Sequence, residues 1–283
     1  VQSYLEKNLQ AAIDRYEIQN GAFGIVMDVN SGAIVAMATL GSFDPNDHRA
    51  IYDEVLNERL EQQYQQLLRL QKGTEEFEKA KTEYNQAVAA ARLKQWRNRC
   101  VSDGYEPGST FKIITLSMAL EEGAVTENDS FFCGGNVNVL GRTSPIRCWK
   151  SGGHGSQNLT QAVQHSCNVA FVNIGQRVGA ESFYKYCEGF GFLELSPDPD
   201  AMLSATTGID LAGESGSIWW SKNTFCSEKN LSQLAAASFG QTFTITPLQL
   251  ITAVSACVNG GRLMKPYVVR QMLNSDGTTA YER

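Results

Sequence analysis

Several features that mark common protein classes are missing from this 283-residue sequence. It has no apolar run long enough to span a bilayer, no P-loop and no Cys-x-x-Cys pair. Basic residues are too few to outweigh the acidic ones, and the net charge of -6 argues against a nucleic-acid partner. With 42% hydrophobic and 19% charged residues, the composition is that of a globular chain of one large domain or two modest ones.

The sequence begins at Val1 with neither an initiator methionine nor a signal-peptide pattern. We therefore expect a processed or trimmed piece of a longer protein, which leaves open a membrane anchor outside these residues.

The seven cysteines are an odd number, in a chain too large to need disulfides for its stability. Cys133 and Cys148 flank a Gly-rich segment and could pair in an oxidising compartment, but two free thiols explain them equally well. A zinc site of Cys133, Cys148 and His154 is disfavoured, because their spacing matches no standard ligand pattern.

Hydrophobic periodicity predicts the elements of the first hundred residues. An amphipathic helix is expected over 2–17, and two β-prone runs around an Asn-Ser-Gly turn predict a hairpin over 22–39. Residues 48–97 are rich in Glu, Gln, Lys, Leu and Ala and form two apolar stripes divided by Gly73, which indicates a helical hairpin. A solvated insertion whose helices pack on each other is favoured over a partner-binding arm.

The remaining residues predict further helices and a short strand. Residues 123–160 and 193–229 read as irregular, and a strand over 267–273 leads into a turn, after which the chain ends where a partner strand would begin. The expected helices span 109–122, 159–178, 181–192, 231–238 and 247–258.

Ser109 and Lys112 form a Ser-x-x-Lys motif at the start of an apolar helix. This spacing places both side chains on one helix face, where a lysine can act as base for a serine nucleophile. The lysine must be partly neutral to do so, which burial promotes. The motif alone occurs often by chance, and a capping serine beside a surface lysine is its ordinary explanation.

A second candidate element is Ser166-x-Asn168, 57 residues after Ser109. Its hydroxyl can pass a proton and its amide can hold a substrate amide. The neighbouring His165 is a further candidate base, although a structural role is favoured.

Taken with their flanks, these motifs resemble the transpeptidase domain of class B penicillin-binding proteins, a serine acyltransferase family marked by Ser-x-x-Lys, Ser-x-Asn and Lys-Thr-Gly. The resemblance extends over nearly the whole chain apart from 48–97. The segments that carry it are 43–46, 97–99, 105–112, 148–149, 153–155, 166–168, 240–241, 246–250 and 259–261, with Phe171 and Pro266.

The resemblance implies roles for individual residues. Ser109 would be the acylated nucleophile and Lys112 its base, while Ser166 and Asn168 would relay protons and hold the peptide. Cys167 and Trp149 are carried over as substrate-binding candidates, with loop-anchoring as the alternative for Trp149. No metal or cofactor is implied.

The same resemblance implies the partners and location of the parent protein. These are a peptidoglycan stem peptide ending in D-Ala-D-Ala, β-lactam antibiotics and candidate contacts with cell-wall synthesis machinery. The domain would lie on the extracytoplasmic face of the bacterial cytoplasmic membrane, with the anchor in an N-terminal segment outside these residues.

The third motif is lacking, since no Lys-Thr-Gly or Lys-Ser-Gly occurs in the sequence. We therefore expect residues 1–283 to form a partial transpeptidase domain of α+β class, a helical subdomain with an antiparallel sheet, that stops before this motif and lacks C-terminal strands. Such a chain would be weakly active or inactive. The alternatives are a serine β-lactamase or D,D-carboxypeptidase, or a non-catalytic β-lactam-binding module.

Overall fold

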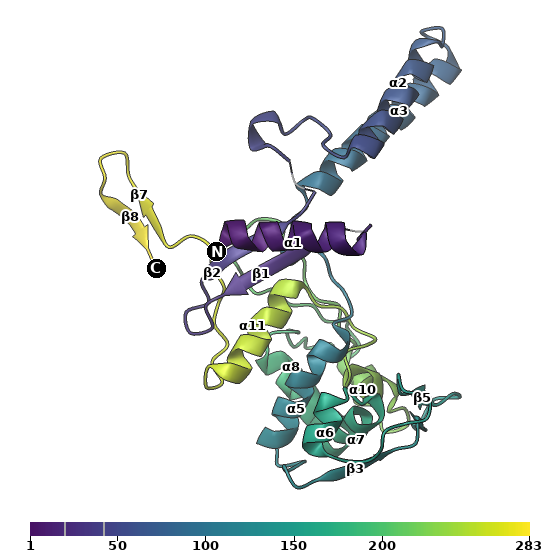
Figure 1. The fold of residues 1–283 in the computed structure, drawn as a ribbon, viewed down its shortest axis with the longest axis vertical. Helices are drawn as coiled ribbons and strands as arrows, with labels where there is room; N and C mark the ends of the chain where they lie inside the picture. Colours follow the sequence, from purple (N-terminus) through teal and green to yellow (C-terminus); the bar gives the residue numbers. More distant parts are fainter. Residues whose placement is uncertain (20, 42) are drawn as a thin grey trace. The chain divides into compact units, whose positions relative to one another are not determined.

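A computed structural model describes residues 1–19, 21–41 and 43–283. Its elements are helices and short antiparallel strands, which confirms the predicted α+β class (Figure 1). The chain divides into two compact units, one of Val1–Gly24 with Ala36–Cys100 and one of Ile25–Val35 with Val101–Arg283. No helix of the described residues is both long and apolar enough to cross a membrane.

The first unit contains helix α1 (Gln2–Tyr16) and a pair of longer helices, α2 (Glu54–Leu68) and α3 (Glu75–Trp96). The 3₁₀ helix η1 (Pro45–Asp47) precedes the pair. Strands β1 (Phe23–Met27) and β2 (Ile34–Thr39) form the expected hairpin, and α4 (Arg99–Ser102) follows α3; the residues of these three elements are divided between the two units. The predicted helix over 2–17 and the helical hairpin within 48–97 are thus confirmed.

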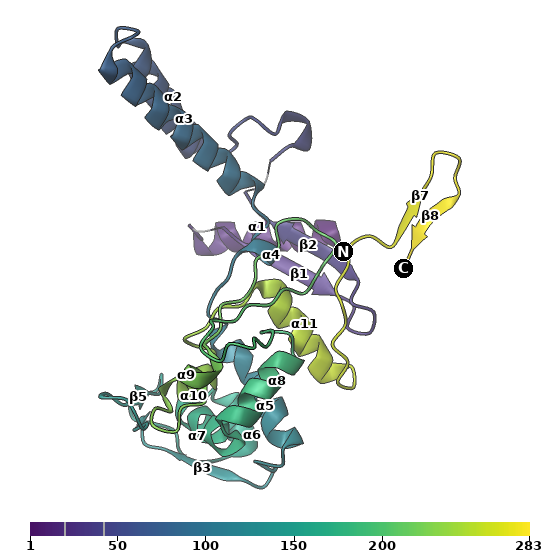
Figure 2. The same ribbon diagram turned by 180° about the vertical axis from the view of Figure 1, so that it is seen from behind.

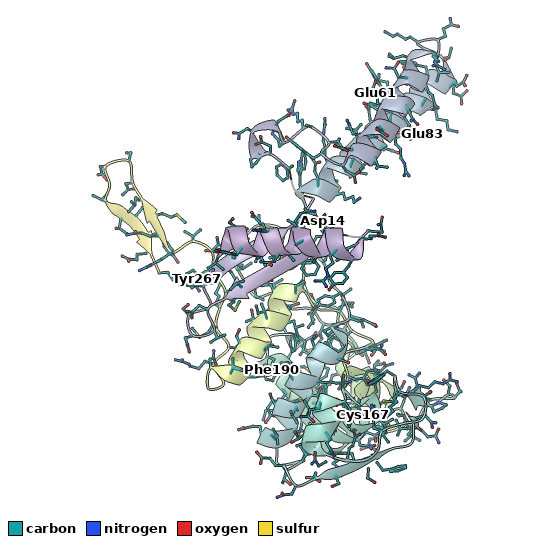
Figure 3. The ribbon with its side chains drawn as sticks, in the orientation of Figure 1. Asp14, Glu61, Glu83, Cys167, Phe190 and Tyr267 are labelled. Carbon is teal, nitrogen blue, oxygen red and sulfur yellow. The ribbon has the colours of Figure 1, made fainter. Side chains whose placement is uncertain are left out.

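The ends of the helical hairpin follow from its capping residues. The Asp53 side chain accepts a hydrogen bond from the Leu56 amide and begins α2, and Thr74 caps α3 in the same way. Gly73, with φ of 84°, supplies the left-handed turn between them. Figure 3 shows Glu61 and Glu83 on the two neighbouring helices, and the rings of Tyr64 and Tyr84 lie 5.3 Å apart across their interface.

The second unit is built around a helical core. Its helices are the 3₁₀ helix η2 (Gly108–Phe111), α5 (Lys112–Glu121), α6 (Leu159–Gln164), α7 (Asn168–Val178), α8 (Ala180–Gly189), α9 (Lys222–Phe225), α10 (Ser232–Ala237) and α11 (Pro247–Val258). In Figures 1 and 2 the helices α5, α7 and α10 lie side by side.

Aromatic residues fill the centre of this unit. The fully buried ring of Phe111 packs against the rings of Phe183, Phe192, Trp219 and Phe243. This cluster anchors the start of α5, the helix that carries the Ser-x-x-Lys motif.

Close contact between α7 and the end of α10 fixes the second motif's helix. A Cβ atom at Gly175 would lie 2.6 Å from the Cβ of Ser238, closer than two carbon atoms can pack. Ser238 in turn accepts a hydrogen bond from the Thr115 hydroxyl of α5 at its carbonyl oxygen, at 2.9 Å. The helices bearing the two motifs therefore share one rigid neighbour.

The single helix predicted over 159–178 is wrong. The structure has two helices, α6 and α7, and the chain turns between them at Ser166, whose φ is 47°. Asn158 caps α6 in a capping box and the Cys167 sulfur caps α7. The predicted helix continued through this segment because its apolar spacing is uninterrupted, whereas the break is made by tertiary packing.

Short strands complete the unit. Strand β3 (Ser130–Cys133) pairs antiparallel with β6 (Gly155–Asn158), and β4 (Asn136–Val137) pairs with β5 (Ile146–Arg147). At the end of the chain, β7 (Gln271–Leu273) pairs with β8 (Thr279–Glu282). The expectation that the chain would end before a partner strand is therefore wrong, and the predicted strand over 267–273 is shorter than expected.

Candidate active site

Ser109 occupies the first turn of the continuous helical segment η2–α5. Gly108 enters this turn with φ of 58°, and its amide donates to the Gly240 carbonyl oxygen at 2.8 Å. The Thr110 hydroxyl closes the turn by donating to the Pro107 carbonyl oxygen at 2.7 Å. Because Phe111 is anchored in the core, the hydroxyl of Ser109 is held on the exposed side of the turn.

Lys112 lies one turn further on and its side chain is buried, with 5% of its surface exposed. Its Nζ atom donates to Ser109 Oγ at 3.2 Å, to Ser166 Oγ at 3.0 Å and to the Ser166 carbonyl oxygen at 2.7 Å. A fourth acceptor, Asn168 Oδ1, lies 2.8 Å away. The structure thus brings together all four residues predicted to be catalytic.

Burial makes the neutral form of Lys112 more accessible than that of an exposed lysine. Burial lowers its pKa to about 8, although the nearby Cys148 and Cys167 side chains oppose this shift. An ammonium group has three protons to donate and no lone pair. A neutral amine instead keeps a lone pair that can accept a hydrogen bond from a serine hydroxyl.

The turn between α6 and α7 presents the Ser-x-Asn motif to Lys112. The left-handed conformation of Ser166 aims both its hydroxyl and its carbonyl oxygen at Lys112 Nζ. Asn168 is the first residue of α7, and its amide nitrogen donates to the Arg147 carbonyl oxygen at 3.3 Å while its oxygen faces Lys112. A continuous helix could not direct both side chains to one amine.

The remaining site candidates lie beside this turn. The Trp149 side chain is 68% exposed, and its indole N–H donates to the His165 carbonyl oxygen at 2.9 Å. The His165 ring bonds to Gln157 Oε1 at 3.0 Å and stacks on His154 with ring centroids 4.9 Å apart. Within the described part of the chain His165 has no hydrogen bond to Ser109 or Lys112, so its geometry suits bracing the loop.

The Cys167 side chain does not fit its predicted role in substrate binding. It is fully buried, and its sulfur accepts a hydrogen bond from the Ala170 amide at 3.5 Å. Its N-cap position in α7 turns the sulfur away from the exposed Ser109 hydroxyl and toward the core.

Of the two alternatives for Cys133 and Cys148, a disulfide or free thiols, the structure has free thiols. The sulfur of Cys148 lies 3.9 Å from that of Cys167. Cys133, Cys148 and His154 do come together, with Cys167 as a fourth member. Sequence spacing missed this cluster because the members come from four separate loops and elements.

A buried amine between two serine hydroxyls and an amide oxygen can accept and return a proton at an exposed hydroxyl. This is the local chemistry of a serine acyltransferase. A family model for the penicillin binding protein transpeptidase domain matches residues 22–282, and the chain belongs to that family.

Individual relatives support this membership. Stage V sporulation protein D of Bacillus subtilis is 34% identical over 97% of the chain, and the transpeptidase PbpA of Mycobacterium tuberculosis is 27% identical over 92%. The chain spans 34% and 46% of the length of these two relatives.

Solved structures show the same fold. Penicillin binding protein 3 of M. tuberculosis superposes with a TM-score of 0.71 at 22% identity, covering all of this chain and 50% of the other. The D,D-transpeptidase domain of a peptidoglycan glycosyltransferase from Eggerthella lenta gives 0.70 at 24% identity, with 98% and 58% covered.

Proposed function

We propose that this chain carries the acylation centre of a peptidoglycan D,D-transpeptidase. The observation that carries the proposal is the position of Lys112 Nζ, within hydrogen-bond distance of Ser109, Ser166 and Asn168 at once. The names of relatives as D,D-transpeptidases support the reaction, and β-lactam complexes of similar folds support the inhibitor class.

Acylation begins with neutral Lys112. Its amine takes the proton from Ser109 Oγ, and the oxygen attacks the carbonyl carbon of the penultimate D-Ala of a stem peptide. The C–N bond to the terminal D-Ala then breaks, and the leaving amine gains a proton through the Ser166 hydroxyl, which lies 3.0 Å from Lys112 Nζ. The products are an ester on Ser109 and free D-alanine.

Acyl transfer reverses the same proton path. An amine from a neighbouring stem peptide attacks the ester carbonyl and loses a proton toward Lys112, and Ser109 regains its own proton as the ester bond breaks. The Asn168 amide, oriented by Lys112 and the Arg147 carbonyl oxygen, would hold the substrate backbone. A β-lactam would follow the first half and remain as an ester.

The cell-wall setting follows from the same relatives. The parent protein would act on the extracytoplasmic face of the cytoplasmic membrane, where D-Ala-D-Ala stem peptides are exposed, and would work with other cell-wall synthesis proteins. The similarity to stage V sporulation protein D favours a spore-forming context.

The test is the fate of a synthetic stem peptide and of a chromogenic cephalosporin. The 283-residue chain, whose sequence contains no Lys-Thr-Gly, should release D-alanine from the peptide slowly, Ser109→Ala should release none, and the cephalosporin should be consumed in proportion to the protein. Catalytic turnover of the cephalosporin would instead identify a β-lactamase. A folded chain that neither releases D-alanine nor traps the cephalosporin would be a non-catalytic module, an alternative suggested by the missing Lys-Thr-Gly motif.

A further inference from the structure

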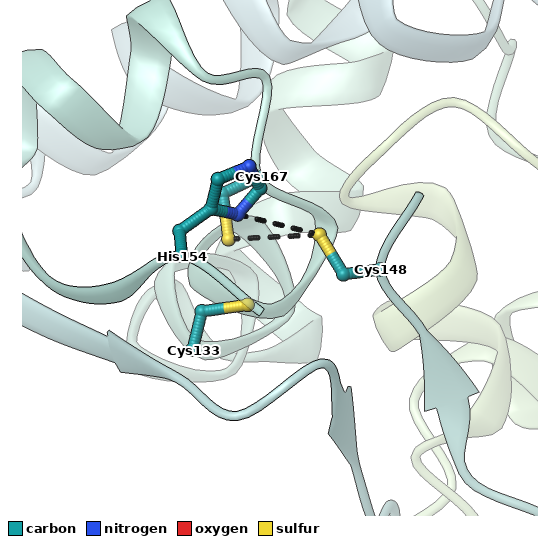
Figure 4. A group of neighbouring side chains, drawn as sticks. All are labelled: Cys133, Cys148, His154 and Cys167. Atoms are coloured by element: carbon teal, nitrogen blue, oxygen red, sulfur yellow. Dashed lines mark hydrogen bonds between the residues drawn. The ribbon is translucent and has the colours of Figure 1, made fainter. Parts of the chain in front are cut away.

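Three thiols and an imidazole converge behind the Ser-x-Asn turn. The ligand atoms of Cys133, Cys148, His154 and Cys167 all lie within 4.8 Å of one another. Figure 4 shows the four side chains directed toward a common centre. We propose that this cluster is a structural zinc site.

Two of the separations between ligand atoms match those around a tetrahedral ion. Zinc bonds of about 2.3 Å to sulfur and 2.0–2.1 Å to nitrogen place two sulfur ligands about 3.8 Å apart, and a sulfur and a nitrogen about 3.5 Å apart. The Cys148 and Cys167 sulfurs are 3.9 Å apart, and Cys148 Sγ lies 3.6 Å from His154 Nδ1. A disulfide would need about 2.05 Å between the sulfurs.

The backbone around the cluster is folded to bring these residues together. The β3–β6 register sets Cys133 opposite Gly155, next to His154, and the Cys148 amide donates to the Gly135 carbonyl oxygen at 2.8 Å. Gly153, with φ of 71°, permits a close approach of the two segments, since a Cβ there would collide with the Cys133 carbonyl oxygen.

Burial and hydrogen bonding leave the cluster in need of a partner. The three cysteines are 6% exposed or less, and thiols are only weak hydrogen-bonding groups. Among the described residues, the Cys148 thiol is the one hydrogen-bond partner of His154 Nδ1, at 3.6 Å. A cation bound to the ring would supply a strong interaction that the protein atoms do not.

The donor set selects the ion and its role. Three thiolates and one imidazole in tetrahedral arrangement suit zinc, whereas magnesium and calcium prefer oxygen ligands. Four protein ligands fill the coordination shell, which leaves no open position for water or substrate. A site with a filled coordination shell is structural. Each thiol releases its proton to solvent as it binds the ion.

The consequence for the active site comes through Cys167. This residue lies between Ser166 and Asn168 and caps α7, so a metal bond to its sulfur would hold the turn that directs both side chains at Lys112. This effect on acylation depends on the proposed transpeptidase function, whereas zinc binding itself does not.

Zinc binding is tested on the fully reduced, metal-stripped chain dialysed against zinc. Elemental analysis should find about one zinc ion per chain. The control variant Cys226→Ser, which changes a cysteine outside the cluster, should still bind one zinc ion. Cys148→Ser should weaken zinc affinity by more than the roughly 100-fold that loss of an outer-shell partner produces. A folded, reduced wild-type chain without stoichiometric zinc would overturn the proposal, as would a Cys148–Cys167 disulfide that forms in preference to the zinc complex.

Cobalt substitution keeps the test valid if Cys148→Ser misfolds. Cobalt bound to the wild-type chain should show thiolate-to-metal charge transfer and the intense visible bands of tetrahedral coordination. Weak octahedral bands would contradict the assignment.

Acylation by labelled penicillin separates the two proposals. Stripping zinc should slow acylation and increase amide exchange at residues 163–169. Stoichiometric zinc without acylation would disprove only the catalytic proposal, and acylation by a reduced chain that fails to bind zinc would disprove only the metal site.

Discussion

Lys112 Nζ lies 2.7 Å from the carbonyl oxygen of Ser166 and 3.0 Å from its hydroxyl oxygen. These two contacts join helix α5 to the turn between α6 and α7. They depend on the left-handed conformation of Ser166, since a helical residue would direct its carbonyl oxygen along the helix axis. The position of the base and the shape of the turn are therefore linked.

Replacing Lys112 by arginine should abolish its action as a base while retaining the positive charge. Guanidinium does not lose its proton near neutral pH, so acylation by labelled penicillin should fall by about 10²–10⁴-fold. Lys185→Arg, an exposed lysine of α8, is the matched control and should acylate normally. Acylation of Lys112→Arg at the wild-type rate would show that Lys112 is not the base.

The acylation rate should rise with pH through about 8, the lowered pKa of Lys112. Below this pKa the amine is protonated and cannot accept the Ser109 proton, so the rate should fall about tenfold for each pH unit. Stopped-flow measurements with a penicillin should show this limb followed by a plateau. A rate that is flat from about pH 6 to 9 would contradict a lysine base with this pKa.

Gly240→Ala should destabilise the turn that carries Ser109. Gly240 has φ of 81°, and a Cβ there would collide with the Gly108 carbonyl oxygen. The left-handed conformation alone costs about 1–2 kcal/mol, and displacement of Gly108 should also slow acylation. Gly189 is the matched control, because its φ is not positive and a Cβ added there would meet nothing within 4 Å beyond its chain neighbours and its own helix backbone. Urea unfolding should therefore find little loss for Gly189→Ala, and equal stability of the two variants would refute the packing argument.

The helical hairpin can be tested with two neighbouring leucines of α2. Leu67 is 6% exposed and Leu68 is 53% exposed. Leu67→Ala should lower the stability of the α2–α3 pair by about 2–5 kcal/mol, while Leu68→Ala should change it little. Hydrogen exchange of the α2 and α3 amides would measure the difference. Similar exchange in both variants would mean that the helices do not pack through Leu67.

Local sequence patterns were enough to predict those elements and contacts that depend on residues close together in the chain. The Ser-x-x-Lys spacing predicted the contact between Ser109 and Lys112, and Pro247 at the first position of the expected helix over 247–258 predicted the start of α11. Gly73 likewise separated the two expected helices of the hairpin.

Features that depend on distant contacts were not predictable in this way. No glycine or proline marks the helix break at Ser166 in the sequence. The break is accompanied instead by a contact with Lys112, which lies on another helix. The cluster around Cys148 and Cys167 likewise arises from the pairing of β3 with β6 and from the close approach at Gly153. The spacing of residues along the chain predicts neither the break at Ser166 nor this cluster.

The most direct test of the catalytic assignment is intact-protein and peptide mass spectrometry after incubation with a labelled penicillin. A single adduct should map to Ser109, disappear in Ser109→Ala and persist in Ser117→Ala, whose hydroxyl bonds within α5 to the Ile113 carbonyl oxygen. A folded wild-type chain without an adduct, or an adduct that survives in Ser109→Ala, would contradict the account.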